Sequence, residues 1–448
     1  MITSTRNRIQ TQTTINLITF MHAFAYKNGH MYCEEVNLAD IASAVGTPTF
    51  VYSRKTIMDD LAELQTALAP LDAHVAYAVK ACSNKAILNL MAQQGVGFDI
   101  VSGGELWRVV NAGGDPTLCT YAGVGKTEAE IRYALGLNIY CFNCESENEL
   151  REINRIAGEM GVKAPVAVRV NPHVDAHTHK YITTGTSENK FGVDISRIEE
   201  LYATIAAEMP HLHIRGLQMH IGSQLTEIAP FVKAIEKVAP IAKKFKELYN
   251  IEFWSIGGGI GIVYDGCLES GKPEWWAAHP QQITLTGYAE AIIPLLQPLG
   301  LKILVEPGRR LVGNAACMLT TCLYEKKGEA KTFKMIDAGM NDIIRPALYE
   351  GYHEIWPVKE HANDTIVADI VGPICESGDF QAQNREIADV KPGEVLAEMS
   401  AGAYGFSMAS TYNSRPLAAE VLVDGDKWHV IRKRQTLEQM VEGECLPQ

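Results

Sequence analysis

Eight short apolar segments alternate with helical patterns between residue 48 and about residue 306, and this alternation constrains the fold more than any other feature. We expect strands at 75–80, 97–101, 118–122, 139–143, 166–171, 214–220, 253–256 and 303–306. Amphipathic patterns of helical period follow these strands, except the last one, for example at 84–93, 105–111, 128–135 and 230–249. Repeats of this number and spacing predict a (β/α)8 TIM barrel.

An open, doubly wound sheet is the alternative for strands that alternate with helices. Such sheets usually have fewer strands and carry a glycine-rich fingerprint after the first strand. No such fingerprint follows residue 80. The barrel is therefore the preferred prediction.

A second pattern begins after Arg309, where short alternating runs are broken by Gly, Pro, Asp and Asn. The runs lie at 316–323, 333–337, 365–371, 394–399, 420–423 and 427–431. They predict a β-domain of the Greek-key or β-barrel kind, to which segment 23–37 is expected to add an N-terminal strand. We predict a tail over 1–20, an N-terminal segment over 21–47 that joins the β-domain, the barrel over 48–309 and the β-domain over 310–448.

Composition and net charge argue against several classes of partner. The chain has 448 residues, which favours two domains, and its net charge of −13 argues against nucleic acid or an anionic membrane as a partner. No apolar run is long enough to span a membrane. The ten cysteines are scattered, mostly in apolar stretches, which is typical of reduced cysteines in a cytoplasmic protein.

Two local features remain open to more than one interpretation. Residues 1–20 could be an unstructured tail, a transit peptide or an upstream start that precedes Met21. Cys141 and Cys144 form a CxxC pair, but no second pair stands at zinc spacing, so we interpret them as part of a strand.

Polar residues gather where the predicted barrel strands end, which is where TIM barrels carry their chemistry. Lys80 ends an apolar strand, and a buried lysine is costly unless it is paired or neutral. Desolvation lowers the pKa of a lysine, which favours Schiff-base formation with a carbonyl, although a strand-end lysine can also extend into solvent. The other strand-end candidates are Asp99, Ser102, Asn143, Arg169, Asn171, His220, Ser223, 257–261, Glu306 and Arg309.

Glycines after the seventh strand (257–261) and the sequence EPGRR after the eighth indicate a phosphate site, because barrels often bind phosphate there. A phosphate site opposite a carbonyl-reactive lysine predicts pyridoxal phosphate. Glu306 would then face the pyridine nitrogen, or it would pair with Arg309. His220 would stack on the ring, or it would be a core histidine.

Two further clusters of polar residues could be functional or structural. His173, His177 and His179 lack a carboxylate partner at clear spacing, so we predict a loop over the barrel mouth and no metal. Cys375 and Glu376 follow a Gly-Pro turn, where a buried structural cysteine is the ordinary expectation.

Longer stretches of the chain resemble the fold-type III pyridoxal-phosphate decarboxylases, which share an alanine racemase-like barrel, and most specifically the diaminopimelate decarboxylases. The matching stretches, together with weaker matches between them, extend from about residue 48 to residue 423. The stretches are YAVKACSN, FDIVSGGEL, NPHVDAHTHKYITTGTSENKFG, HIGSQ, GGGIG, EPGRRLVGNA, DAGMNDIIRPALYEGYH, GPICESGDF and GAYGFSMASTYNSRP.

The resemblance implies a carboxy-lyase that converts meso-2,6-diaminopimelate to L-lysine and CO2, the last step of L-lysine biosynthesis, with pyridoxal 5'-phosphate as cofactor. Lys80 would bind the cofactor as a Schiff base, and His220 would stack on it. Cys375, from the other subunit of a homodimer, would return the proton to the substrate carbon at an active site on the subunit interface. Cofactor binding is implied for Ser223, Gly257, Gly258, Gly259, Glu306, Pro307, Gly308, Arg309 and Tyr404, and substrate binding for Arg309, Arg345, Tyr349, Glu376 and Tyr404.

The chemical groups at the distal end of the substrate distinguish the alternative decarboxylase activities of this fold. Two arginines suit a distal carboxylate and Glu376 suits an ammonium, whereas ornithine, arginine and carboxynorspermidine decarboxylases would differ here. A racemase of the alanine type needs a second base, and a cofactor-carrying homeostasis protein resembles a barrel alone. The chain departs from the family pattern at Cys82, His173, Lys180 and Arg310, of which we expect Cys82 and Arg310 to lie near the cofactor.

Overall fold

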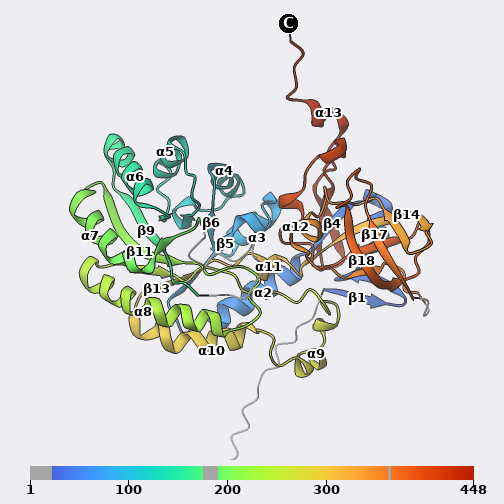
Figure 1. Cartoon of the computed structure of the whole chain (residues 1–448), viewed down its shortest axis with the longest axis horizontal. Helices are drawn as coiled ribbons and strands as arrows, with labels where there is room; N and C mark the ends of the chain where they lie inside the picture. Colours follow the sequence, from blue (N-terminus) through green and yellow to red (C-terminus); the bar gives the residue numbers. More distant parts are fainter. Residues whose placement is uncertain (1–22, 175–189, 362–364, 448) are drawn as a thin grey trace, which may run out of the picture.

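The structure, a computed structural model, describes residues 23–174, 190–361 and 365–447. It has two lobes: a barrel wrapped in helices and a β-rich lobe beside it (Figure 1). No helix in these ranges is long and apolar enough to cross a membrane.

The predicted barrel is confirmed within the described residues. Its eight strands pair in parallel in the order β9-β11-β12-β13-β5-β6-β7-β8, and β8 pairs with β9 to close the sheet. A short strand, β10 (Val193–Asp194), pairs in parallel with the end of β9. The barrel strands are β5 (Ala73–Ala78), β6 (Gly97–Ile100), β7 (Cys119–Tyr121), β8 (Cys141–Cys144), β9 (Ala164–Asn171), β11 (Leu212–Met219), β12 (Phe253–Ser255) and β13 (Lys302–Val305).

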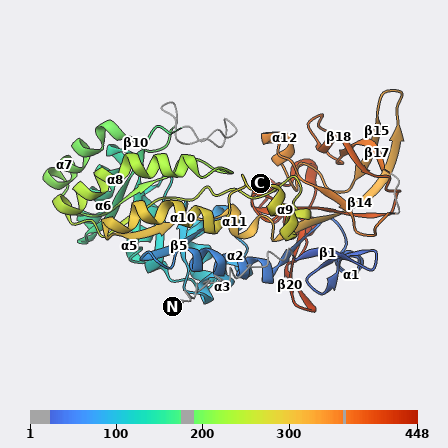
Figure 2. The same cartoon turned by 90° about the horizontal axis from the view of Figure 1, so that it is seen from below.

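Helices cover the outside of the barrel strands (Figures 1 and 2). Several begin at a residue whose side chain accepts a backbone N–H, as helix starts require. Thr127 forms a capping box with Glu130, and Ser102, a strand-end candidate from the sequence, caps α4. The barrel helices are α2 (Arg54–Ala67), α3 (Lys85–Gln93), α4 (Gly103–Asn111), α5 (Glu128–Gly136), α6 (Glu147–Met160), α7 (Ile198–Glu208), α8 (Ala229–Tyr249), α9 (Pro273–Ala278), α10 (Leu285–Leu296) and α11 (Arg309–Val312).

The second lobe is built on a mixed sheet with the order β18-β17-β15-β14-β4-β20-β21, and β19 pairs with both β14 and β16. One interior strand, β4 (Thr49–Ser53), lies between β14 and β20 and precedes the barrel strands in the sequence. The other strands are β14 (Ala316–Lys327), β15 (Thr332–Ile336), β16 (Ile355–Pro357), β17 (Thr365–Val371), β18 (Phe380–Ala388), β19 (Val395–Glu398), β20 (Ala419–Asp424) and β21 (Lys427–Arg432), with helices α12 (Arg345–Tyr349) and α13 (Leu437–Val441).

The N-terminal strand of this sheet is β4, not segment 23–37. That segment forms its own antiparallel sheet of β1 (Phe24–Lys27), β2 (His30–Cys33) and β3 (Val36–Asn37), followed by α1 (Leu38–Val45). The small sheet packs on the β-domain, because Phe24 and Met31 share a buried cluster with Leu319. The domain limits stay a prediction, and the pairing of β4 favours a barrel that starts after residue 53.

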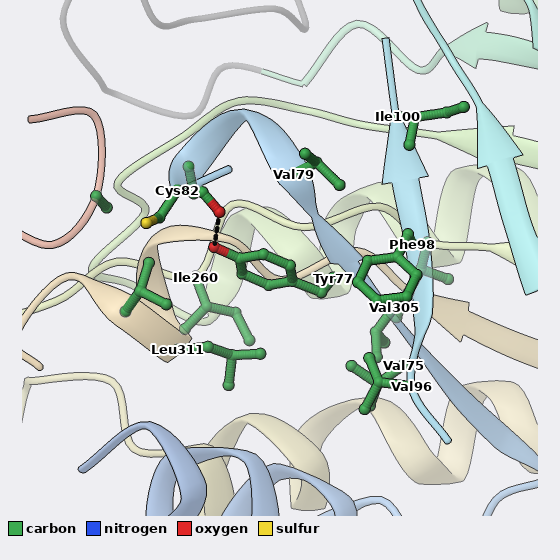
Figure 3. Packing of buried hydrophobic residues seen from close by; sticks show 14 of the residues in the cluster. Val75, Tyr77, Val79, Cys82, Val96, Phe98, Ile100, Ile260, Val305 and Leu311 are labelled. Atoms are coloured by element: carbon green, nitrogen blue, oxygen red, sulfur yellow. Dashed lines mark hydrogen bonds between the residues drawn. The ribbon is translucent and has the colours of Figure 1, made fainter. Parts of the chain in front are cut away.

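Successive side chains along β5 point alternately toward the surrounding helices and toward the barrel interior. Val75, Tyr77 and Val79 face the helices and pack in the main core (Figure 3). The intervening Ala76 and Ala78 face the barrel interior, since successive side chains point to opposite faces. The same direction brings Lys80 to the mouth of the barrel.

Candidate active site

Lys80 lies at the centre of the polar residues at the barrel mouth. It follows β5 in a single 3₁₀ turn, Val79–Ala81, rather than ending the strand as predicted. Its Nζ donates a hydrogen bond to Oδ2 of Asp99 over 2.9 Å. The side chain of Lys80 is 41% exposed, whereas that of Asp99 is 1% exposed. The amine is therefore accessible from the mouth and held by a buried carboxylate.

The expected lowering of the lysine pKa is not found. Burial lowers the pKa of Lys80, but the nearby Asp99, Tyr404 and Glu306 outweigh this effect and raise the pKa above its ordinary value. Without another group in the site, the amine is a charged partner of Asp99.

Glu306 lies deep in the barrel and accepts hydrogen bonds from three strands. Its Oε1 accepts from Oγ of Ser255 at 2.6 Å and from Nδ2 of Asn143 at 3.4 Å, and its Oε2 accepts from Nε2 of Gln218 at 3.1 Å. Burial and the charge of Asp99 raise the pKa of Glu306 to about 7. The alternative pairing of Glu306 with Arg309 does not occur.

Sequence reasoning missed Ser255 and Gln218, which lie inside strands and point inward. Alternation along each strand was the signal that could have found them. Several buried polar atoms in the barrel have no partner in the described part of the chain: Oδ1 of Asp99, Oγ1 of Thr120, Oδ1 of Asn143 and Oε1 of Gln218. Orphaned polar atoms in a core are costly, so the interior suits a polar ligand.

The glycines after β12 are required by close backbone approach. A Cβ on Gly258 would lie 2.0 Å from the Glu306 carbonyl oxygen, and one on Gly257 would lie 2.4 Å from that of Met219. Gly259 has φ +107, and its Cβ would lie 2.2 Å from the Gly222 carbonyl oxygen. These glycines bring three strand-end loops into contact at the mouth.

His220 belongs to the same rim. Its Nδ1 accepts a hydrogen bond from the backbone N–H of Gly258 at 3.3 Å. Burial, and then the charges of Arg169 and Lys80, hold the pKa of His220 well below its ordinary value. The imidazole is therefore neutral, which suits stacking on a ring.

Arg309 and Arg345 both contact Tyr264. The Arg309 guanidinium donates to the Tyr264 hydroxyl and, over 3.3 Å, to Oγ of Ser223, and the Arg345 guanidinium lies 4.4 Å from the centroid of the Tyr264 ring. Arg309 also lies 4.8 Å from the ring of Tyr404, whose backbone N–H donates to the carbonyl oxygen of residue 81. The second lobe thus reaches the neighbourhood of Lys80.

These two arginines are buried without an acidic partner. Arg309 and Arg345 are 7% and 6% exposed, and the hydrogen bonds of their guanidinium groups within the described ranges go to Tyr264, Ser223 and His353 and not to a carboxylate. Burial lowers the pKa of Arg345, and the charge of Arg309 acts in the same direction. Two unneutralised guanidinium groups make a site for an anion.

Cys375 and Glu376 are not brought to this mouth by the contacts of the single chain. Both are exposed on a loop of the second lobe, where the Cys375 backbone N–H donates to Oδ1 of Asn413 at 2.7 Å. The expectation of a buried cysteine is therefore wrong. Tyr349 is partly buried at the end of α12, the helix that begins with Arg345.

Arg310 and Cys82 turn away from Lys80, contrary to expectation. Arg310 pairs with acidic residues of α2. The Cys82 thiol lies 3.8 Å from the Tyr52 hydroxyl, and its carbonyl oxygen accepts from the Tyr77 hydroxyl at 3.0 Å (Figure 3). Neither contact reaches the barrel mouth.

The remaining sequence candidates have structural surroundings. His173 pairs with Asp194 at 2.6 Å, while His177, His179 and Lys180 lie outside the described residues, as does the tail over 1–20. No group of three potential metal ligands occurs in the described ranges. All ten cysteines are unpaired, and Cys141 and Cys144 are buried in β8.

Pyridoxal phosphate fits the arrangement. Lys80 offers an exposed amine for the aldehyde, and Glu306 offers a carboxyl group in the barrel interior for the ring nitrogen. The pair of Ser223 and Arg309, beside the glycine loop, provides a hydroxyl and a cation for the phosphate. Arg345 lies beyond them, where a second anionic group could bind.

Comparison with known proteins agrees with this geometry. Residues 54–313 match the family described as pyridoxal-dependent decarboxylase, pyridoxal binding domain. The chain is 45% identical over 428 residues to the diaminopimelate decarboxylase of Pseudomonas aeruginosa, a match that covers 95% of this chain and 99% of the relative. It is 46% identical over 419 residues to that of Neisseria meningitidis serogroup B, covering 93% and 98%.

Solved structures give the same result. The diaminopimelate decarboxylase of M. jannaschii in complex with L-lysine superposes with a TM-score of 0.87 at 35% identity, covering 96% of this chain and 99% of that one. The Helicobacter pylori enzyme complexed with L-lysine gives 0.84 at 39% identity, covering 91% and 98%. With a matching pyridoxal binding domain and relatives aligned over nearly their whole length, the chain belongs to the diaminopimelate decarboxylase family of pyridoxal-dependent decarboxylases.

Proposed function

We propose that this protein decarboxylates meso-2,6-diaminopimelate to L-lysine and CO2, the last step of L-lysine biosynthesis. The observation that carries this proposal is the buried pair Arg309 and Arg345 on either side of Tyr264, without a carboxylate of the described chain to neutralise it. A substrate with a distal carboxylate supplies the missing charge, because guanidinium groups bind carboxylates by paired hydrogen bonds.

Bound pyridoxal phosphate supplies the electron sink for the carbanion left when CO2 departs. Lys80 holds the cofactor aldehyde through Nζ, and Asp99 keeps that amine oriented by the 2.9 Å hydrogen bond. Glu306 holds the proton at the ring nitrogen. The neutral His220 packs against the ring face without adding charge.

Ser223, the glycine loop and the backbone that leads into Arg309 would hold the cofactor phosphate. Tyr404 closes this end of the site, since its ring lies against Arg309. Tyr349 contacts the substrate from the end of α12, and Arg309 and Arg345 bind its distal carboxylate.

The protein acts as a homodimer in this proposal, with the active site at the subunit interface. Cys375 returns the proton to the substrate carbon, and Glu376 binds the distal ammonium. Both are exposed and remote from the contacts made by Lys80 within one chain. A second copy that presents this loop to the barrel mouth would complete the site, and its thiol would be the proton donor.

Decarboxylation of ornithine, arginine or carboxynorspermidine is the alternative on the same fold. Their distal groups lack a carboxylate that Arg309 and Arg345 could bind, and two guanidinium groups would repel a bare cation. The unpaired state of all ten cysteines supports a reducing compartment, and we place the enzyme in the cytoplasm.

The test is an assay of CO2 and L-lysine released from meso-diaminopimelate, run beside ornithine and arginine. We expect release from diaminopimelate and at most traces from the other two. Equal release from ornithine would overturn the substrate assignment. A purified protein that stays colourless after addition of pyridoxal phosphate would contradict every pyridoxal-dependent activity.

A further inference from the structure

A cavity of about 600 Å³ lies outside the candidate active site. Its lining residues come from α2, from the start of α11 and from the segment 261–284 that contains α9. The two neighbours Arg309 and Arg310 diverge here: Arg309 faces Tyr264 and Ser223, whereas Arg310 lines the cavity. Arg310 is also a residue at which the chain departs from the family pattern.

The charges that line the cavity do not balance. Arg310 lies 2.9 Å from Oδ1 of Asp60 and 3.3 Å from Oε2 of Glu63, so one guanidinium serves two carboxylates. At the rim, Lys55 and Asp59 pair with each other. Burial raises the pKa of Asp60 to about 6, with Arg310 opposing it, and burial likewise raises the pKa of Glu63. When Asp60 and Glu63 are both ionised, Arg310 neutralises only one of the two negative charges.

Several buried polar atoms of the cavity wall also have no hydrogen-bond partner in the described structure. Oε1 of Glu63 and Oγ1 of Thr56 have no partner in the described structure, and both residues are only 9% exposed. Oδ1 of Asn314 is likewise unpartnered. All three residues line the cavity. Unsatisfied acceptors beside excess negative charge call for a ligand that donates hydrogen bonds.

Apolar surface forms the remaining wall. Ile262, Ile283 and the half-buried Trp276 line the cavity, and the Trp276 indole N–H donates to the Ser270 carbonyl oxygen at 2.7 Å, which holds the ring in place. The volume falls in the range of small-molecule sites and far exceeds that of a metal ion. The ligand therefore carries an apolar body as well as a charge.

We propose that this cavity binds a small organic cation, an ammonium or guanidinium group on an apolar stem, whose head bonds to Glu63 and Thr56 and whose stem lies against Trp276. The site is distinct from the one that binds the decarboxylation substrate, because the Arg310 side chain pairs with Asp60 and Glu63 of α2, whereas the Arg309 side chain bonds to Tyr264 and Ser223. The proposal does not depend on the function proposed above.

Isothermal titration of the cofactor-loaded enzyme with n-butylguanidinium tests the proposal. This probe donates hydrogen bonds and lacks the primary amine that would react with the cofactor aldehyde. We expect saturable binding, weakened about tenfold or more in Glu63→Gln, which removes the charge but keeps the volume. Neutral n-butylurea should not bind.

Two further variants separate a local site from general effects. Ala62→Leu keeps every charge and fills the cavity from an exposed position of α2, so it should abolish binding even if Glu63→Gln disturbs the helix. Glu290→Gln removes an exposed acid of α10 outside the cavity and should bind like the wild type. Equal affinity in the wild type and Ala62→Leu, or no binding to the wild type, would overturn the proposal.

Discussion

Lys80 Nζ donates a 2.9 Å hydrogen bond to Asp99 Oδ2, and this contact joins the accessible lysine in the turn after β5 to a buried carboxylate of β6. Asp99 raises the pKa of Lys80 against the lowering effect of burial. The relationship sets the pH at which the amine is free to react with the cofactor aldehyde, since only the neutral amine is nucleophilic.

Asp99→Asn should therefore shift cofactor attachment to lower pH. Removing the carboxylate leaves burial as the dominant influence, so the pKa of Lys80 falls and a larger fraction of the amine is neutral near pH 7. The measurement is the rate of pyridoxal phosphate attachment to the apoprotein against pH, trapped with borohydride. We expect a displacement of about one pH unit or more. Asp426→Asn, at an exposed turn, should leave the profile unchanged.

Gly258→Ala should disrupt the mouth of the barrel. Its Cβ would lie 2.0 Å from the Glu306 carbonyl oxygen, so the backbone that carries Glu306 must move. We expect a loss of about 2 kcal/mol or more in the free energy of unfolding, together with weaker cofactor retention. Gly136→Ala is the matched control, because a Cβ there meets nothing within 4 Å at the end of α5. Comparable unfolding of the two variants would contradict the steric argument.

Arg345→Ala should weaken substrate binding by about 2–5 kcal/mol, because the substrate carboxylate loses a buried partner. The effect is expected in KM for diaminopimelate. Arg385→Ala serves as the control, since Arg385 also lies in the second lobe and contacts the His353 carbonyl oxygen, but does not lie against Tyr264. A KM unchanged from the wild type in Arg345→Ala would count against the assignment of the distal carboxylate.

Mixing two inactive variants tests whether the site is shared between subunits. Lys80→Ala and Cys375→Ala each lack one essential group, but a mixed dimer regains one intact site if the two groups come from different chains. Roughly a quarter of the wild-type activity should return after subunit exchange, as expected for a twofold-symmetric dimer. Activity that stays at the level of the separate variants would place both groups in one chain or exclude the dimeric site.

Glu398→Gln should increase stability toward alkaline pH. Glu398 is fully buried, neither carboxyl oxygen has a partner in the described ranges, and burial followed by Asp342 raises its pKa to about 8. The unfolded chain releases this proton near its ordinary pKa, so wild-type stability falls as pH rises between about 4.5 and about 8. The glutamine variant lacks this loss.

Thermal unfolding of Glu398→Gln and the wild type across this pH window measures the effect. The variant should gain on the order of 5 kcal/mol relative to the wild type between the two ends, with a plateau above pH 8. Glu236→Gln, at an exposed position of α8, should show no such trend. A constant difference between variant and wild type would mean that Glu398 is ionised throughout.

The barrel and the position of its mouth were predictable from the sequence, because strand and helix periodicities are local properties of a chain. Each apolar run between 75 and 306 became a strand, shifted by one or two residues at its ends. Lys80, His220 and Glu306 were predicted as site residues because chemistry concentrates at the carboxyl ends of such strands, and the structure brings the three close together at the barrel mouth. Ser255 and Gln218 were missed because they lie within strands, whereas the sequence candidates came from the positions that follow strands, although alternation along β12 and β11 turns both side chains inward.

Other features depended on contacts between distant segments. The insertion of β4 between β14 and β20 and the outward turn of Arg310 toward α2 are decided by packing that no local pattern records. The charge balance at Lys80 is of the same kind, since Asp99 comes from the next strand and reverses the effect of burial. The sequence by itself determined which residues could carry the chemistry, because residue type and the periodicity of apolar residues are local properties of the chain. Only the tertiary structure decided which of them meet, because electrostatic and steric interactions act over a few ångströms in space, whatever their separation in sequence.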